Sequence, residues 1–98
     1  MLVAEKSIAL QDAVQHMGFN SVEDFALDKA KENLSSEMAV CLSNIKKIEE
    51  KYGMDYADFC LHFHELNFPL FDKEEDSADW NAEMKQLSIL QKRLASLY

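Results

Sequence analysis

Residues 60–65 carry side chains that could bind a metal ion or act as a nucleophile, in the order Cys60-x-His62-x-His64 followed by an acidic residue. On a helix, Cys60 and His64 share a face, whereas His62 points elsewhere. A tetrahedral metal site needs four ligands, and the remaining cysteine and histidine are remote in sequence. A Cys–His nucleophile would also need an orienting group and donors for an oxyanion. We therefore expect no metal, no cofactor and no enzymatic activity, with Cys60 buried and the two histidines partly exposed.

A second group with possible ligand chemistry is the acidic run of residues 72–79. Its five carboxylates belong to Asp72, Glu74, Glu75, Asp76 and Asp79. A calcium loop of the EF-hand type has a glycine at its turn and ligands in an alternating register, and this run has neither. The run is therefore predicted to be a solvated acidic linker.

Large apolar side chains surround the single proline, Pro69, directly before the acidic run. The aromatic ones are Phe63, Phe68, Phe71 and Trp80. An exposed apolar patch with a charged rim is typical of a protein-docking surface. The alternative is that all four rings close the core of a helical hairpin. For docking, the predicted apolar contacts are Phe68, Leu70, Phe71 and Trp80, and the predicted charged rim is Asp72, Glu74, Glu75 and Asp76.

The composition limits the classes of function. The 98 residues suffice for a single domain, and 48% of them are hydrophobic, which argues against a disordered tail. Ten Lys and Arg face 18 Asp and Glu, a formal charge of −8. This balance lacks the basic footprint that binds phosphate backbones and favours a basic protein partner, although it also keeps a small protein soluble. The lack of a membrane-length apolar run or a signal peptide, together with two separated cysteines, predicts a cytoplasmic protein with reduced thiols.

Glycine and proline are scarce, and apolar residues recur at helical spacing almost everywhere. We therefore predict an all-α fold of about four helices. The first helix is expected over residues 7–17, with Ser7 as its cap and Gly18 as its end. Ser21 caps a second helix, which nothing in the sequence interrupts before Tyr52.

Gly53 ends the second helix and Asp55 caps a third over residues 56–66, where the proline that follows breaks the helix. A fourth helix, expected over residues 77–97, folds back on an apolar seam in residues 34–52. The seam has the four–three spacing of a coiled coil: Leu34, Met38, Cys41, Ile45, Ile48 and Tyr52. A seam this short indicates helix packing within the chain. The apolar side of the fourth helix consists of Trp80, Met84, Leu87, Leu90, Leu94 and Leu97.

Two stretches resemble ribbon-helix-helix antitoxins from bacterial toxin–antitoxin operons. In residues 16–34, HMGFNSVEDFALDKAKENL, the match to the turn between two family helices is carried by Gly18, Phe19, Ser21, Asp24 and Phe25. The stretch IKKIEEKYGMDYADF resembles the helical extension and joint common in small antitoxin-like proteins, and this match is carried by Lys51, Tyr52, Gly53, Met54, Asp55 and Phe59. The resemblance implies a dimerising, DNA-binding part over residues 1–52. It also implies a partner-binding helical part over residues 53–98 that wraps and neutralises a toxin.

These observations lead to three hypotheses. The chain is an antitoxin-like protein-binding module that masks a basic partner, or an autoregulatory DNA-binding protein that dimerises through its first two helices. The third hypothesis is a scaffold that self-associates through the seam of residues 34–52. DNA reading in the family uses an N-terminal strand with polar or basic side chains, and residues 1–8 have Lys6 as their only basic side chain, which argues against DNA binding. The sequence leaves open whether residues 1–8 form a strand.

Overall fold

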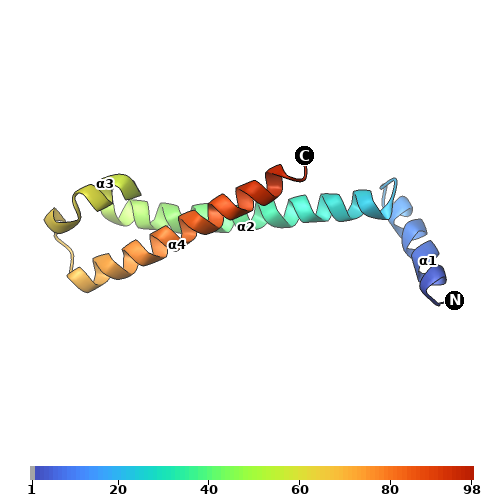
Figure 1. Ribbon diagram of the computed structural model, residues 1–98, viewed down its shortest axis with the longest axis horizontal. Helices are drawn as coiled ribbons and strands as arrows, with labels where there is room; N and C mark the ends of the chain where they lie inside the picture. Colours follow the sequence, from blue (N-terminus) through green and yellow to red (C-terminus); the bar gives the residue numbers. More distant parts are fainter. Residues whose placement is uncertain (1) are drawn as a thin grey trace.

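The computed structural model describes residues 2–98, with side chains from Glu5 onward. Over this range the chain is all-α, as predicted, and contains no strand. Four α-helices and one short 3₁₀ turn, η1, follow one another (Figure 1): α1 Leu2–His16, α2 Val22–Tyr52, α3 Tyr56–Leu61, η1 Phe63–Glu65 and α4 Leu70–Ala95. The long helices α2 and α4 lie side by side and antiparallel, while α1 leaves the beginning of α2 at an angle.

Helix α1 begins at Leu2 and not near Ser7 as predicted. The first residues of this helix include Leu, Ala, Glu and Lys, which favour helix, and no glycine or proline, so nothing in them prevents an early start. Ser7 accordingly lies inside α1. Residues 2–8 are therefore helical and form no strand, while Met1 lies outside the described residues.

The joint between α1 and α2 has the predicted chemistry. Gly18 adopts a positive φ of 99°, which a residue without a side chain takes at little cost. Ser21 Oγ accepts a hydrogen bond from the backbone N–H of Asp24 at 3.0 Å and so caps α2. Phe19 and Phe25 pack edge to face across the joint, with 5.2 Å between their ring centroids.

Helix α4 packs along the predicted seam of α2, as expected. Cys41, Ile45 and Tyr52 of the seam are buried, and Trp80 and Leu90 of α4 are buried as well. The seam is thus covered by α4 of the same chain, which is the packing that its short length predicted.

The main core lies at the closed end of the hairpin, where α2, α3 and α4 meet. Four aromatic residues, Tyr52, Phe59, Phe68 and Trp80, form what we term the tip cluster. The ring centroid of Tyr52 lies 4.7 Å from that of Phe59 and 4.6 Å from that of Phe68, and the rings of Phe59 and Trp80 are 5.3 Å apart. Each such aromatic pair adds about 0.5–1.5 kcal/mol beyond the area that it buries.

The connection from α3 to α4 differs from the prediction. Helix α3 ends at Leu61, earlier than expected, and α4 begins at Leu70 and not near Ser77. The acidic run of residues 72–79 therefore forms the first turns of α4 and is not a linker. Pro69 precedes this helix with a φ of −54°, close to the helical value, and carboxylates are stabilised near the positive end of a helix dipole.

Lys73 stabilises this connection, a role that no pattern in the sequence indicated. Its side chain is buried, and its Nζ donates hydrogen bonds to the carbonyl oxygens of Phe63 at 2.8 Å and Leu66 at 3.2 Å. The same ammonium lies 4.9 Å from the centroid of the Phe63 ring. Carbonyls at the end of a helical turn lack donors within the turn, and Lys73 supplies them.

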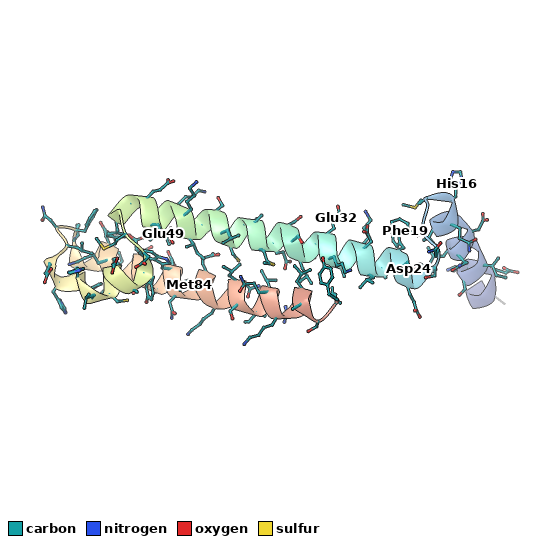
Figure 2. The ribbon with its side chains drawn as sticks, turned by 90° about the horizontal axis from the view of Figure 1, so that it is seen from above. His16, Phe19, Asp24, Glu32, Glu49 and Met84 are labelled. Carbon is teal, nitrogen blue, oxygen red and sulfur yellow. The ribbon has the colours of Figure 1, made fainter. Side chains whose placement is uncertain are left out.

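The molecule is elongated, with extents of 67 × 24 × 19 Å and a radius of gyration of 21.0 Å. A compact domain of this length would have a radius of about 13 Å. Figure 2 shows the cause: α4 covers only part of the length of α2, and α1 stands apart from the hairpin. Within residues 2–98, no helix combines the length and the apolar character that crossing a membrane would need.

Replacing Gly53 by alanine is expected to lower the free energy of unfolding by about 1–2 kcal/mol, the usual cost of a left-handed conformation for a residue with a Cβ. Gly53 has a φ of 71°, and no atom lies within 4 Å of the position of an added Cβ, so the cost comes from the backbone alone. Urea denaturation followed by circular dichroism measures it. Asparagine tolerates this conformation, so Gly53→Asn is the control, and an equal loss for both variants would contradict the assignment.

Candidate protein-binding site

The predicted docking residues divide into buried and exposed ones. Trp80 is fully buried in the tip cluster and offers no accessible surface, which corrects its place in the predicted site. The reason is that its indole lies on the face of α4 that meets α2 and α3. Phe68 is half-buried and packs against Tyr52. Leu70 and Phe71, by contrast, are 57% and 73% exposed.

The predicted acidic rim is divided in the same way. Asp76 Oδ2 accepts hydrogen bonds from Tyr52 Oη at 2.5 Å and from Lys51 Nζ at 2.6 Å, so this carboxylate ties α4 to α2. Asp72 is half-buried. The accessible remainder of the predicted site, which we term the elbow surface, consists of Leu70, Phe71, Glu74 and Glu75.

The contacts of Asp76 determine the protonation of three groups. Burial alone would raise the pKa of the Asp76 carboxyl, but the hydrogen bonds from Lys51 and Tyr52 outweigh it, and the pKa lies below its ordinary value. Burial and the hydrogen bond to Asp76 raise the pKa of the Tyr52 phenol. The same carboxylate raises the pKa of the Lys51 ammonium through its hydrogen bond. At neutral pH, the acceptor is therefore ionised and both donors keep their protons.

The sequence did not indicate a groove that lies where α2, α3 and α4 converge. This three-helix groove has a volume of about 380 Å³ and is lined by Leu42, Ile45, Glu49, Asp55, Tyr56, Ala57, Trp80, Met84 and Leu87. Ile45 and Trp80 are buried and form its base, whereas Leu42 and Met84 are 52% and 42% exposed. The groove therefore combines a fixed apolar base with accessible apolar sides.

The lining of the three-helix groove suits an apolar side chain with a cation beside it. Most lining residues are aliphatic or aromatic, and a methionine such as Met84 adapts its shape to different partners. Glu49 and Asp55 are the charged residues of the lining, and both are acidic. The sequence contains one indication of this groove, because Leu42 widens the apolar seam of α2. The other side of the groove is formed by α3, and its position beside Leu42 depends on the tertiary fold.

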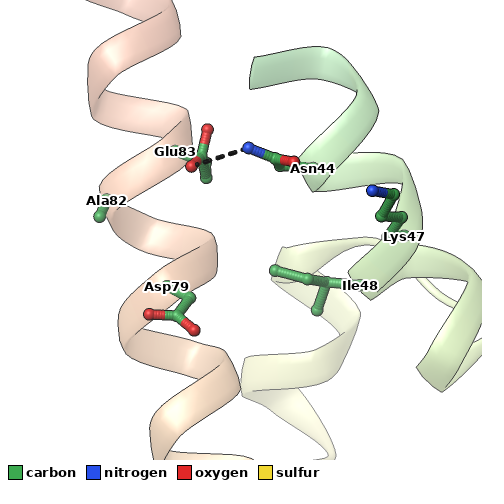
Figure 3. A pocket seen from close by; sticks show the side chains of 6 residues that line it. All are labelled: Asn44, Lys47, Ile48, Asp79, Ala82 and Glu83. Atoms are coloured by element: carbon green, nitrogen blue, oxygen red, sulfur yellow. Dashed lines mark hydrogen bonds between the residues drawn. The ribbon is translucent and has the colours of Figure 1, made fainter. Parts of the chain in front are cut away.

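A second hollow, of about 360 Å³, lies between α2 and α4 (Figure 3). It is lined by Asn44, Lys47, Ile48, Asp79, Ala82 and Glu83. Asn44 Nδ2 donates a hydrogen bond to Glu83 Oε1 at 3.1 Å and so joins the two helices. Burial, and then a hydrogen bond with Glu83, raises the pKa of the Cys41 thiol. This hollow contains charges of both signs, and a hydrogen bond spans it. We therefore assign it to the packing of α2 against α4.

The group Cys60, His62 and His64 does not assemble into a metal site. His62 Nδ1 lies 3.0 Å from Glu65 Oε2, and the described part of the chain holds no group of three His, Cys, Asp or Glu side chains placed for a metal ion. Cys60 is exposed, which corrects the prediction that it is buried. The inner face of α3 is occupied by Phe59, so its neighbour Cys60 points outward.

Cys60 and Cys41 are expected to differ sharply in their reaction with the thiol reagent DTNB. Cys60 is exposed, whereas Cys41 is buried and its raised pKa lowers the fraction of reactive thiolate. One thiol per chain should react rapidly in the native protein, and both should react after denaturation. Cys60→Ser should abolish the fast phase and Cys41→Ser should retain it. Rapid reaction of both native thiols would contradict the burial of Cys41.

Replacing Asp76 by asparagine is expected to lower the free energy of unfolding by about 2 kcal/mol at neutral pH, because hydrogen bonds to a charged acceptor contribute about 1.5–3 kcal/mol. The folded-state pKa of Asp76 lies below its unfolded value of about 3.9. The contribution is therefore fully present above the unfolded pKa and is lost as the pH falls through the folded pKa.

Urea titrations of the wild type and the Asp76→Asn variant, repeated from neutral to strongly acidic pH, measure this difference. Glu74→Gln is the matched control, because it neutralises an exposed carboxylate on the same helix and should change stability little. A difference between wild type and Asp76→Asn that stays constant down to strongly acidic pH would show that the ionised carboxylate is not its source.

Comparison with known proteins adds no relative: no protein-family model, no curated protein and no solved structure matches the chain. The resemblance of residues 16–34 and 45–59 to ribbon-helix-helix antitoxins therefore stays a prediction.

Proposed function

We propose that this chain is an acidic helical protein-binding module whose three-helix groove holds a basic amphipathic segment of another protein. The observation that carries this proposal is the convergence of three helices on an apolar groove whose charged lining residues are both acidic. Ile45 and Trp80 are buried and hold the base in place, and Leu42 and Met84 expose apolar area at the sides. Grooves of this kind receive the apolar face of a helix.

The charge of the chain supports a basic partner. The formal charge is −8, and acidic residues accompany both accessible apolar surfaces: Glu49 and Asp55 at the groove, Glu74 and Glu75 at the elbow surface. Complementary charge accelerates association and disfavours like-charged partners. Phe71, which is 73% exposed, is the most exposed apolar side chain of the elbow surface.

In the form that the family resemblance implies, the partner is a basic toxin, and the module neutralises it by covering its surface. Support for the DNA-binding alternative is weaker. Residues 2–16 form a helix where a ribbon-helix-helix protein would place its DNA-reading strand. Glu23 and Asp24 occupy the first turn of α2, and their charge opposes a phosphate at that helix end.

A labelled synthetic helix tests the groove directly. The probe is a peptide with leucines along one face and lysines on the other, and its fluorescence anisotropy is followed as protein is added. We expect binding that weakens with salt, and at least tenfold weaker binding for a peptide with glutamate in place of lysine, equivalent to about 1.4 kcal/mol. Trp80 is the only tryptophan, so its emission reports changes at the base of the groove.

Two substitutions on α2 provide the matched comparison. Leu42→Lys places a cation at the groove, and it should weaken peptide binding about tenfold or more. Val40→Lys makes the same change in charge at a position that is 60% exposed and outside the groove lining, and it should weaken binding far less. Equal losses in the two variants, or equal affinity for the lysine and glutamate peptides, would refute the groove as the binding site.

The antitoxin form of the proposal has its own test. Co-expression with the product of the neighbouring reading frame should give a complex that survives gel filtration, and the chain should restore growth when that product arrests it. Leu42→Lys should reduce both effects and Val40→Lys should retain them. Growth arrest that the chain does not relieve would exclude neutralisation of that product.

A further inference from the structure

The first helix and the beginning of the second lie beyond the region that α4 covers. We term α1 together with residues 22–30 of α2 the arm. The C-terminal Tyr98 marks the end of the covered region, because Lys31 Nζ lies 4.0 Å from the centroid of its ring. Figures 1 and 2 show α4 ending partway along α2, with the arm continuing past it.

Apolar side chains are exposed along the arm. Val14 is buried at the joint with α2, but Ile8, Leu10 and Met17 of α1 are 71%, 48% and 58% exposed, and Leu27 of α2 is 37% exposed. Leu27 has a particular position: stepping back from Leu34 with the seam spacing of three, four and three leads to residues 31, 27 and 24. The arm thus continues the face of α2 that α4 covers elsewhere.

The accessible surface is larger than a compact single chain would have. The chain exposes 7232 Å², whereas a compact monomer of 11.3 kDa exposes about 5,700 Å². The excess of about 1,500 Å² is close to twice the roughly 800 Å² that one partner contributes to a standard interface. The excess is therefore of the size that a stable dimer interface would cover.

The charges on the arm indicate what covers it. Asp24 lies one turn before Leu27 on the uncovered continuation of the seam, and Lys31 lies one turn after Leu27, at the edge of the region that α4 covers. When two copies of this helix pack antiparallel about a two-fold axis midway between Leu27 and Asp28, Asp24 of each copy faces Lys31 of the other. A two-fold contact makes both pairs at once. The groove and elbow surface, whose charges are acidic, have no such self-complementary pattern.

We propose that a second copy of this chain covers the arm in this antiparallel two-fold arrangement. Leu27 lies at its centre, and the two Asp24–Lys31 pairs flank it. The partner's α2 then packs along the stretch of α2 that α4 does not cover, beyond the position of Tyr98. This interface is separate from the three-helix groove, so a dimer retains two grooves for the basic partner.

Sedimentation equilibrium of the full chain over a range of concentrations tests the dimer. We expect an apparent mass that rises with concentration to twice 11.3 kDa. Leu27→Glu should hold the mass at the monomer value, while Leu61→Glu, at a position 75% exposed on α3, should dimerise as the wild type does. A wild type that stays monomeric at every concentration overturns the proposal.

Charge exchange tests the antiparallel register. Lys31→Glu and Asp24→Lys each place like charges opposite one another in a homodimer, so each variant alone should be monomeric at concentrations where the wild type is dimeric. An equimolar mixture of the two restores both opposite-charge pairs and should recover the dimer mass, as should the double variant. Lys29→Glu makes the same charge change off the seam face and is the control.

The remaining outcomes are equally decisive. Failure of the mixture to recover the dimer mass, or loss of the dimer with Lys29→Glu to the same extent as with Lys31→Glu, overturns the register. A mass that doubles only when a basic protein is added shows that the arm serves another partner, and it also overturns the proposal. Since Leu42→Lys should leave the dimer intact, failure of the groove proposal is distinguishable from failure of this one.

Discussion

The hairpin depends on the tip cluster, and within it on Tyr52. The ring of Tyr52 contacts the rings of Phe59 and Phe68, and its hydroxyl donates to Asp76. One residue near the end of α2 thereby joins non-directional apolar packing to a directional, charge-assisted hydrogen bond. The cluster has a cost, since Trp80 Nε1 is buried without an acceptor among the described residues. An unpaired buried donor costs about 1–3 kcal/mol, which the burial of a side chain as large as tryptophan offsets.

Away from the tip cluster, α2 and α4 form a simple pair of helices, and such a pair can bury only part of its apolar surface. Each helix of a pair can cover one stripe of the other, and a third layer is needed to cover what remains. Helix α3 gives this third layer only over a short length, and the three-helix groove lies at its edge, where Leu42 and Met84 remain exposed. The accessible apolar surfaces thus follow from the proportions of the fold: a long α2, a shorter α4 and a very short α3.

The sequence predicted the features that depend on a few neighbouring residues. The caps by Ser21 and Asp55 and the left-handed Gly18 and Gly53 have local causes, and all four are present. Of the features that depend on distant contacts, the packing of α4 along the seam of α2 was predicted, and others were wrong or absent. The start of α4 was placed too late because the acidic run resembled a linker, whereas the helix dipole and the hydrogen bonds of Asp76 favour helix there. The spacing of the apolar residues in the fourth helix already placed Trp80 on the side that packs on α2, whereas the exposure of Cys60 follows from how α3 meets the hairpin.

The carboxylates of the chain fall into two groups: some accept hydrogen bonds within the fold, and others are exposed without such a role. Asp55 accepts a hydrogen bond from the backbone N–H of Asp58, Asp76 from Tyr52 and Lys51, and Glu83 from Asn44. These acids have structural partners within the chain. Glu74 and Glu75 are exposed on α4 beside Phe71, where they add like charge to an already acidic chain. Self-repulsion of this kind lowers the stability of a monomer, and it is relieved when a basic surface covers the acids. The arm differs, because in the dimer that we propose its opposed charges are neutralised by a second copy, so the arm and the groove do not compete for the same partner.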